Sequence, residues 1–193
     1  MRVGIFGGAF NPVHNGHVTI AILSMEYLDL EKLLIVPTYD PPHRDPSILA
    51  PFELRLNWLG KVFDGIKGIE VSDFEEKMGG KSYSFYTIEH FSELYGAKPY
   101  FIIGEDSAVN FEKWYRYEDL MEMATFAVYP RFRNSRFEEL KWRFPSFVLM
   151  DLPLIEISST EIRRRIREGR SIRGMVDSSI EEEVMEFFGR ENG

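Results

Sequence analysis

The sequence predicts an α/β protein in which a doubly wound, Rossmann-like and mostly parallel sheet of about six strands carries helices on both faces. Two observations lead to this fold class: short β-branched apolar runs alternate with helical segments, and the runs are almost continuously apolar. The alternation is typical of parallel strands joined by crossover helices, and the continuous apolar character suits strands covered on both sides. At 193 residues we expect one domain, 1–193, whose last helices span about 157–189.

The expected elements follow one another along the chain. Apolar runs predict strands at 3–6, 33–36, 69–74, 100–103, 126–129 and 147–150. Helices are expected at about 17–27, 51–62, 84–95, 117–123, 135–142, 159–168 and 179–188. Pro51 fits the first position of its helix, and Gly169 fits the position just after the end of another. The loop at 37–51 follows the second strand, so we expect it at the ligand-binding end of the sheet.

Composition narrows the class of protein. Lys and Arg number 23 against 31 Asp and Glu, so the formal net charge is −8 and there is no general attraction to nucleic-acid phosphates. The lack of cysteine excludes disulfides, thiolate metal sites and cysteine nucleophiles. No apolar run approaches the roughly 18 residues of a membrane span, and the first residues have no signal-peptide layout. We expect a cytoplasmic enzyme or small-molecule binder without nucleic-acid or membrane partners; self-association into a homo-oligomer stays open.

The loop after the first strand carries the first candidate site. Residues 7–17 read Gly-Gly-Ala-Phe-Asn-Pro-Val-His-Asn-Gly-His. Gly7 and Gly8 allow a phosphate to approach main-chain N–H groups, and His14 and His17 lie three residues apart at a helix start, where both rings can reach one group. Gly16 lets a bulky group lie flat against the helix. The alternative is a glycine-rich turn with two solvated histidines; the position after the first strand favours a phosphate site.

This motif, G-G-x-F-x-P-x-H-x-G-H, resembles the nucleotidyltransferase superfamily that includes nicotinate-mononucleotide and pantetheine-phosphate adenylyltransferases. The resemblance implies direct attack of a phosphate on the α-phosphorus of ATP, with pyrophosphate leaving and no covalent enzyme intermediate. Such a reaction needs positioning and charge stabilisation more than a protein nucleophile. The resemblance implies catalytic roles for His14 and His17. It also implies ATP binding by the two histidines together with Gly7, Gly8, Ala9, Phe10 and Gly16.

A second phosphate-binding element is expected about 140 residues later. Ser158 and Glu161 have the spacing of a capping box, which leaves the N–H groups of Ser159 and Thr160 in the first helical turn for an anion. Arg163 lies one turn further, and its guanidinium can lean back to the same anion. The alternative is an ordinary capped helix. The remaining arginines are assigned to an exposed basic face: Arg164, Arg165, Arg167, Arg170 and Arg173.

The same superfamily carries an I-S-(S/A)-T-x-I-R element that grips the β- and γ-phosphates of ATP, and residues 157–163 resemble it closely. The resemblance therefore implies that Ser159, Thr160 and Arg163 bind ATP and that Arg163 takes part in catalysis. Within one nucleotidyltransferase domain, the helices at about 157–189 would carry this distal phosphate site.

The middle of the chain resembles the bacterial nicotinate-mononucleotide adenylyltransferases. Their P-P-H-(K/R) loop has its counterpart at residues 41–44, their S-Y-T…T segment at 82–87 and their F-I-I-G-x-D-S segment at 101–107. The resemblance implies an adenosine pocket at Gly104 and Asp106. Without the resemblance, Asp106 is interpreted as a helix N-cap, which is compatible with a place in that pocket. The resemblance also implies an acceptor site formed by His43, Arg44, Ser84, Thr87, Trp114 and Tyr115. The aromatic pair Trp114 and Tyr115 could equally fill the core.

Several positions depart from the family pattern. Ala9 replaces a hydroxyl residue, Asn11 replaces an acid, and Arg131 follows the fifth strand outside the usual R-P-G pattern, so its role is open. Residues 79–82 imitate the end of a P-loop, but Glu75 stands where that motif needs glycine, so a turn is expected there.

The resemblance implies transfer of AMP from ATP to nicotinate mononucleotide, giving deamido-NAD and pyrophosphate in NAD biosynthesis. Mg²⁺ is expected as a cofactor held by phosphate oxygens and water, without dedicated protein ligands. Two alternatives stay open: an adenylyltransferase for nicotinamide mononucleotide or another phosphate acceptor, and a catalytically silent nucleotide-binding sensor. A role in charging tRNA is disfavoured because the chain is short and acidic.

Overall fold

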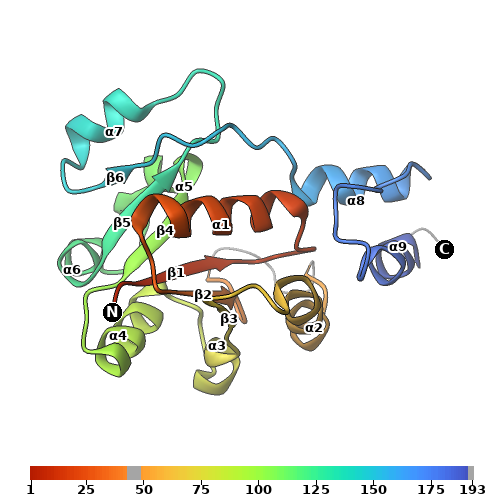
Figure 1. Ribbon diagram of the computed structural model, residues 1–193, viewed down its shortest axis with the longest axis horizontal. Helices are drawn as coiled ribbons and strands as arrows, with labels where there is room; N and C mark the ends of the chain where they lie inside the picture. Colours follow the sequence, from red (N-terminus) through yellow and green to blue (C-terminus); the bar gives the residue numbers. More distant parts are fainter. Residues whose placement is uncertain (43–48, 191–193) are drawn as a thin grey trace.

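The computed structural model describes residues 1–42 and 49–190, in which six parallel strands form one sheet in the order β3-β2-β1-β4-β5-β6. The strands are β1 (Val3–Gly8), β2 (Lys32–Pro37), β3 (Ile69–Val71), β4 (Tyr100–Gly104), β5 (Thr125–Tyr129) and β6 (Val148–Leu149). The parallel α/β fold class is confirmed. β1 pairs with both β2 and β4, so the chain reverses its winding direction at β1 (Figure 1). Ligands bind at this point of doubly wound sheets.

Alternating apolar side chains build a core on each face of the sheet. Leu33 and Ile35 of β2 belong to one core, and Leu34 and Val36 belong to the other. Because side chains of a strand alternate between faces, a continuous apolar run serves two cores at once. The first core is completed by α1 (Asn15–Leu28), α2 (Phe52–Phe63), α8 (Ser159–Arg167) and α9 (Glu181–Gly189). The second is completed by α4 (Ser84–Tyr95), α5 (Glu105–Val109), α6 (Tyr117–Met123) and α7 (Phe137–Arg143).

Three short elements differ from the sequence prediction. The expected strand at 69–74 ends at Val71, because the Ser72 hydroxyl accepts the Phe74 N–H at 3.2 Å and turns the chain into α3 (Phe74–Met78). α5 and the 3₁₀ helix η2 (Phe111–Lys113) were also not predicted. Elements of three to five residues contain little more than one helical turn, so their apolar periodicity is too short to recognise.

Helix boundaries agree with the prediction to within a few residues. Pro51 is the N-cap of α2 and not its first residue, and Gly169 has the positive φ of 66° expected just after the end of α8. α9 begins at Glu181, two residues later than expected. The Gly79–Gly80 segment is a turn as predicted, with positive φ at both glycines.

The C-terminal helices are anchored to α2 by aromatic packing. Figure 1 shows α8 and α9 together at the end of the molecule toward which β1 points. The fully buried Trp58 of α2 contacts the rings of Phe187 and Phe188, each with a centroid distance of 6.1 Å. Its indole N–H donates to Glu183 at 3.2 Å. Thus the helix after the distal phosphate element is held against the first core.

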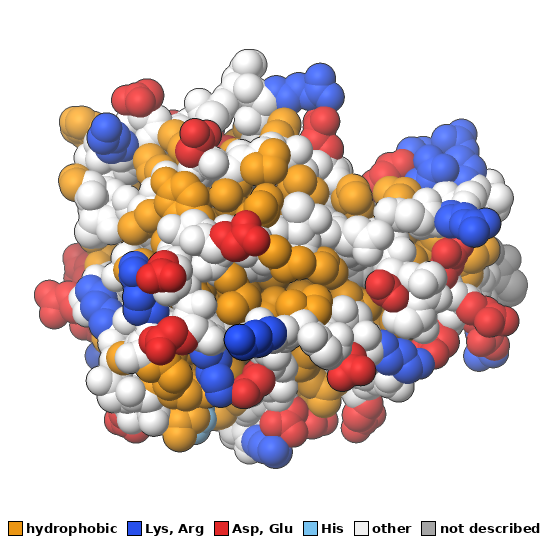
Figure 2. Space-filling model, in the orientation of Figure 1, with side chains coloured by type: hydrophobic (Ala, Val, Ile, Leu, Met, Phe, Trp, Pro, Cys, Tyr) orange, Lys and Arg blue, Asp and Glu red, His pale blue; other side chains and the backbone are white. Residues whose placement is uncertain are grey.

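The charged side chains are spread over the face seen in Figure 2, with a group of Lys and Arg side chains over α8. The last turn of α8 contains Arg164, Arg165 and Arg167. Hydrophobic atoms remain visible in the middle of this face. No helix in the described part of the chain has the length and apolar character needed to cross a membrane.

We predict that Trp58→Ala lowers the free energy of unfolding by about 3–5 kcal/mol, because it leaves a large cavity between α2 and α9. Urea unfolding followed by circular dichroism would measure this. Trp142→Ala is the matched control: Trp142 is 84% exposed, so its loss should change stability by about 0.5 kcal/mol or less. Equal losses in the two variants would contradict the anchoring role of Trp58.

Candidate active site

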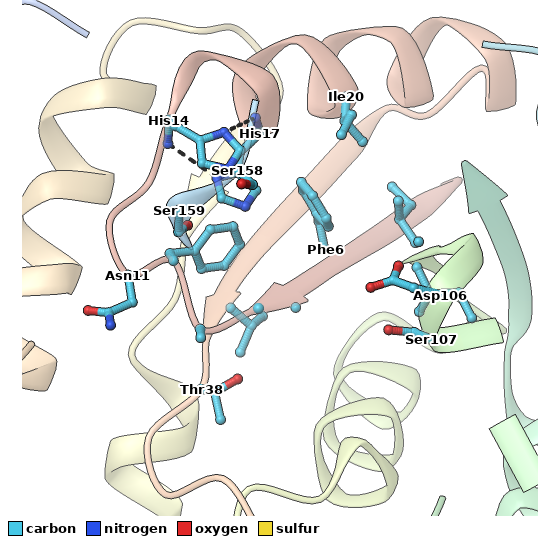
Figure 3. Close-up of a pocket in the computed structure, with 18 of the residues that line it drawn as sticks. Phe6, Asn11, His14, His17, Ile20, Thr38, Asp106, Ser107, Ser158 and Ser159 are labelled. Carbon is cyan, nitrogen blue, oxygen red and sulfur yellow. Dashed lines mark hydrogen bonds between the residues drawn. The ribbon is translucent and has the colours of Figure 1, made fainter. Parts of the chain in front are cut away.

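A cleft of about 720 Å³ opens at the carboxyl ends of β1, β2, β4 and β5. Figure 3 shows the start of α1 and the start of α8 on one side of this cleft, with Thr38 and Asp106 at other parts of its wall. Its lining includes these residues: Gly7, Gly8, Ala9, Phe10, Asn11, His14, His17, Thr38, Glu75, Ser82, Ser84, Thr87, Gly104, Asp106, Trp114, Arg131, Ser159, Thr160, Arg163 and Arg167. The two phosphate elements expected from sequence therefore share one cleft.

His14 and His17 form a reciprocal cap at the start of α1, in which the side chain of each accepts the backbone N–H of the other. The His17 N–H donates to Nδ1 of His14 at 3.3 Å, and the His14 N–H donates to Nδ1 of His17 at 3.2 Å. Their rings are stacked with a centroid distance of 3.6 Å. Because both Nδ1 atoms accept hydrogen bonds, each neutral ring carries its proton on Nε2. The helix consequently begins at Asn15, two residues before the predicted start.

Burial keeps these imidazoles uncharged. His14 is 4% exposed, so the alternative of solvated histidines is wrong for this residue. Burial, with a smaller contribution from the positive charge of Arg131, lowers the pKa of His14 to about 3. Burial also lowers the pKa of His17 well below its usual range, and His14 and Arg131 add to this effect. Near neutral pH the pair therefore offers two N–H donors and no positive charge.

The start of α8 is fastened to the loop after β1. The Ser159 hydroxyl donates to the Pro12 carbonyl at 2.8 Å, and Nη1 of Arg163 donates to the Asn11 carbonyl at 2.6 Å. Ser158 caps the helix by accepting the Glu161 N–H at 3.2 Å. Glu161 does not complete the predicted capping box, because its carboxylate pairs with Arg164. Ser159, Thr160 and Arg163 all line the cleft, as the sequence predicted for an anion site.

Two further arginines line the same cleft. Arg167 was assigned to the exposed basic face; it is exposed, but it also borders the cleft one turn beyond Arg163. Arg131, whose role the sequence left open, lies with its Nε 3.8 Å from Oδ1 of Asp106. Asp106 is inside α5, whose N-cap is Gly104, so the N-cap interpretation of Asp106 is wrong. A Cβ on Gly104 would approach Oδ1 of Asp106 to 2.4 Å, so glycine leaves room for that carboxylate.

A buried acid holds the segment that carries Arg131. The Glu105 carboxylate is fully buried and accepts the N–H groups of Arg131 at 2.9 Å and Phe132 at 3.3 Å. It also accepts the Ser135 hydroxyl at 3.0 Å and the Arg136 N–H. The sequence does not reveal this role of Glu105, because an acid directly after a strand has no pattern that distinguishes a buried side chain holding a loop from a solvated one.

Arg55 clamps two loops under the cleft, the one after β1 and both ends of the one between β2 and α2. Its guanidinium donates to the carbonyls of Ala50, Ala9 and Thr38, each at 2.8 Å. The departure at position 11 makes a contact here, because the Asn11 side chain accepts the Ala50 N–H at 2.9 Å. The loop between these anchors includes Phe10 at a φ of 46°, a left-handed conformation that non-glycine residues rarely adopt.

The predicted acceptor residues are only partly brought together. Ser84, Thr87 and Trp114 line the cleft. Tyr115 is outside the lining and exposed, and its ring packs against that of Tyr83 with a centroid distance of 4.5 Å. His43 and Arg44 lie outside the described residues.

Gly16 does not line the cleft either. A Cβ there would lie 2.9 Å from Cγ2 of Ile155 and 3.0 Å from Nδ1 of His14. The side chains that lie against the start of α1 at Gly16 are thus Ile155 and His14 of the protein itself. The predicted ATP contact at Gly16 stays a prediction.

The described residues contain no group of three or more histidine, aspartate or glutamate side chains placed to hold a metal ion. Of the carboxylates that line the described cleft, Asp106 lies 3.8 Å from Nε of Arg131.

Comparison with known proteins gives one consistent result. The model of the cytidylyltransferase-like family matches residues 5–165. A protein of Thermotoga sp. strain RQ2 named "Probable nicotinate-nucleotide adenylyltransferase" is 50% identical over 192 residues, covering 97% of each chain. A relative of the same name from Caldicellulosiruptor saccharolyticus is 39% identical and covers 96% of each chain. The solved nicotinic acid mononucleotide adenylyltransferase of Plasmodium falciparum, complexed with NaAD, has a TM-score of 0.84, with 18% identity, 100% of this chain and 98% of that chain covered.

We predict that the protein loses stability as the pH falls below 6.5 and that His14 accounts for part of the loss. The unfolded His14 takes up a proton below its ordinary pKa of 6.5, whereas the folded residue stays neutral until about pH 3. Between pH 7.5 and pH 5.5 this difference removes about 1.4 kcal/mol of stability. Urea unfolding at both pH values should show a decrease smaller by this amount in His14→Gln. Identical pH dependence in the two proteins would contradict the buried neutral state of His14.

Proposed function

The chain belongs to the nicotinate-nucleotide adenylyltransferase family of cytidylyltransferase-like proteins, and on this premise we propose how its cleft performs adenylyl transfer. The reaction joins AMP from ATP to nicotinate mononucleotide and yields deamido-NAD and pyrophosphate. The observation that carries the proposal is the convergence of two neutral imidazoles and the start of α8 in one cleft. Residues about 145 apart in the sequence thus meet where a triphosphate needs donors along its length.

The histidines would act on the phosphate that is transferred. Both Nδ1 atoms are engaged by backbone N–H groups, so Nε2–H of each ring is the donor that remains for a phosphate oxygen. Because the rings are neutral, they bind by directed hydrogen bonds and do not have to lose a proton before or after reaction. Negative charge that develops on the phosphate oxygens in the transition state strengthens these bonds.

The start of α8 would hold the pyrophosphate that leaves. Arg163 lines the cleft and is already oriented by its bond to the Asn11 carbonyl. The N–H groups of Ser159 and Thr160 lie in the first turn of α8, where the helix dipole also favours an anion. Arg131 and Arg167 add positive charge to the same cleft.

The acceptor would bind against the wall formed by α4 and the residues after β4. Trp114 offers an aromatic surface to a pyridinium ring, and Ser84 and Thr87 place hydroxyl groups at the start of α4. The N-cap residue of α4, Tyr83, makes no side-chain capping bond. The first N–H groups of this helix are thus suited to the carboxylate of nicotinate. Tyr115 is omitted from this assignment.

Mg²⁺ would enter with ATP, held by phosphate oxygens and water. It would supply positive charge next to the phosphates. Asp106 and Glu75 are the acidic side chains that line the described cleft.

We predict that the protein with ATP and Mg²⁺ forms deamido-NAD from nicotinate mononucleotide much faster than it forms NAD from nicotinamide mononucleotide. Chromatography of the products, together with pyrophosphate release, measures both rates. Equal or reversed rates would keep adenylyl transfer and contradict the acceptor assignment. Neither product nor pyrophosphate from either acceptor would overturn the proposal in favour of a silent nucleotide-binding protein.

We predict that Arg163→Gln lowers kcat/KM for ATP by about 10²-fold or more, because a charge-assisted bond to the leaving phosphates is lost. Steady-state kinetics with ATP varied would measure it. The adjacent Arg164 pairs with Glu161 and Glu168 on the exposed side of α8, so Arg164→Gln serves as the matched control. Similar losses in both variants would mean that only the overall charge of α8 matters.

A further inference from the structure

A buried carboxylate lies in the acceptor wall of the cleft and has no part in the steps described above. Glu75 of α3 is 7% exposed and lines the cleft, whereas the neighbouring Glu76 does not line it. Burying a charged carboxylate is costly unless donors compensate it, so its partners indicate what it holds in place. The start of α1 and the start of α8 are at the other wall, and α3 itself is a five-residue helix.

The carboxylate of Glu75 gathers donors from two separate segments. Its Oε2 accepts the Tyr39 N–H at 3.1 Å, and its Oε1 accepts the Thr87 hydroxyl at 3.1 Å. Ser82 binds beside it, since the Ser82 oxygen accepts the N–H groups of Tyr39 at 3.0 Å and Asp40 at 2.9 Å. The chain after β2 and the start of α4 are therefore joined through Glu75 and Ser82.

Glu75 and Arg55 hold opposite ends of one peptide group. The carbonyl of the Thr38–Tyr39 peptide accepts Nη2 of Arg55 at 2.8 Å, and the N–H of the same peptide donates to Glu75. A cation at the oxygen and an anion at the N–H both match the peptide dipole, so the peptide plane has one preferred orientation. Thr38 lines the cleft, and this orientation therefore sets the wall that an acceptor meets.

The same carboxylate sets the direction of the Thr87 hydroxyl. A threonine hydroxyl has one proton, and here the proton is directed at Glu75. The lone pairs of Thr87 are what remains for a ligand, so this hydroxyl accepts hydrogen bonds from the ligand and does not donate them. A nucleotide acceptor provides such donors on its ribose hydroxyl groups.

We propose that Glu75 is a positioning residue for the acceptor nucleotide, acting through the Thr38–Tyr39 peptide and the Thr87 hydroxyl. The inference rests on the proposed function, which supplies the identity of the acceptor. It assigns no contact between Glu75 and the reacting atoms. Arg55 links the two halves of the cleft, because its guanidinium also holds the Ala9 carbonyl of the phosphate loop.

The test is Glu75→Gln, which keeps the shape and removes one acceptor. A carboxamide can accept from Thr87 or from Tyr39, but its NH₂ then faces the other donor. We expect the Kd and KM for nicotinate mononucleotide to rise about tenfold, while the KM for ATP and kcat change less than about threefold. Glu76→Gln removes the same charge one residue away and should leave all constants unchanged. Calorimetry with nicotinate mononucleotide gives the Kd without turnover.

A second variant tests the contact independently of the fold of Glu75→Gln. Thr87→Val removes the hydroxyl at nearly constant shape and should also weaken nicotinate mononucleotide binding. The double variant should lose less than the sum of the two single losses, because both changes affect the hydrogen bond between Glu75 and Thr87. Additive losses, an unchanged Kd in Glu75→Gln, or equal increases in the KM for ATP and the acceptor would each overturn the positioning role. Failure of the wild-type protein to form product would overturn the proposed function, while the Kd comparison still decides the role of Glu75.

Discussion

The cleft depends on the hydrogen bonds that the buried guanidinium of Arg55 donates to main-chain carbonyls. Loops at the carboxyl edge of a parallel sheet leave carbonyl groups without ladder partners, and a buried carbonyl without a partner is costly. Arg55 satisfies three of them from two loops: Ala9 after β1, and Thr38 and Ala50 between β2 and α2. Burial lowers its pKa to about 10, so the guanidinium stays charged near neutral pH. The relative positions of the phosphate loop and the acceptor wall follow from this one side chain.

The strained start of the phosphate loop is tolerable only because other elements fix it. A residue with the φ of Phe10 costs of order 1–3 kcal/mol, and surrounding contacts must compensate that cost. The contacts come from both sides of the loop: Arg55 holds Ala9, while Ser159 and Arg163 hold the carbonyls that follow. Arg163 thus both orients the loop and borders the cleft, so the loop after β1 and the start of α8 form one continuous part of the wall.

Sequence periodicity was sufficient for the sheet, because runs such as 33–36 must serve two cores and few other folds need that. Local motifs also singled out the loop after β1 and the start of α8, which line one cleft. Sequence could not show that His14 and His17 cap one helix reciprocally, since histidine is not a usual cap and the pairing needs both rings to stack. It also missed Glu75 and Glu105, because the donors that make a buried acid stable come from distant segments.

Burial of the histidines divides the chemistry of the cleft between two residue types. An imidazole that is held neutral by desolvation cannot supply positive charge, but its remaining N–H has a direction set by the bond at the opposite nitrogen. Arginine has the opposite properties: its charge persists after partial burial, and its long side chain takes its direction from a partner, as Arg163 does from the Asn11 carbonyl. A phosphate chain in this cleft would meet directed neutral donors at α1 and fixed positive charge at α8. Because charge attracts the whole triphosphate while direction favours one geometry, selectivity for the transition state would come mainly from the histidines.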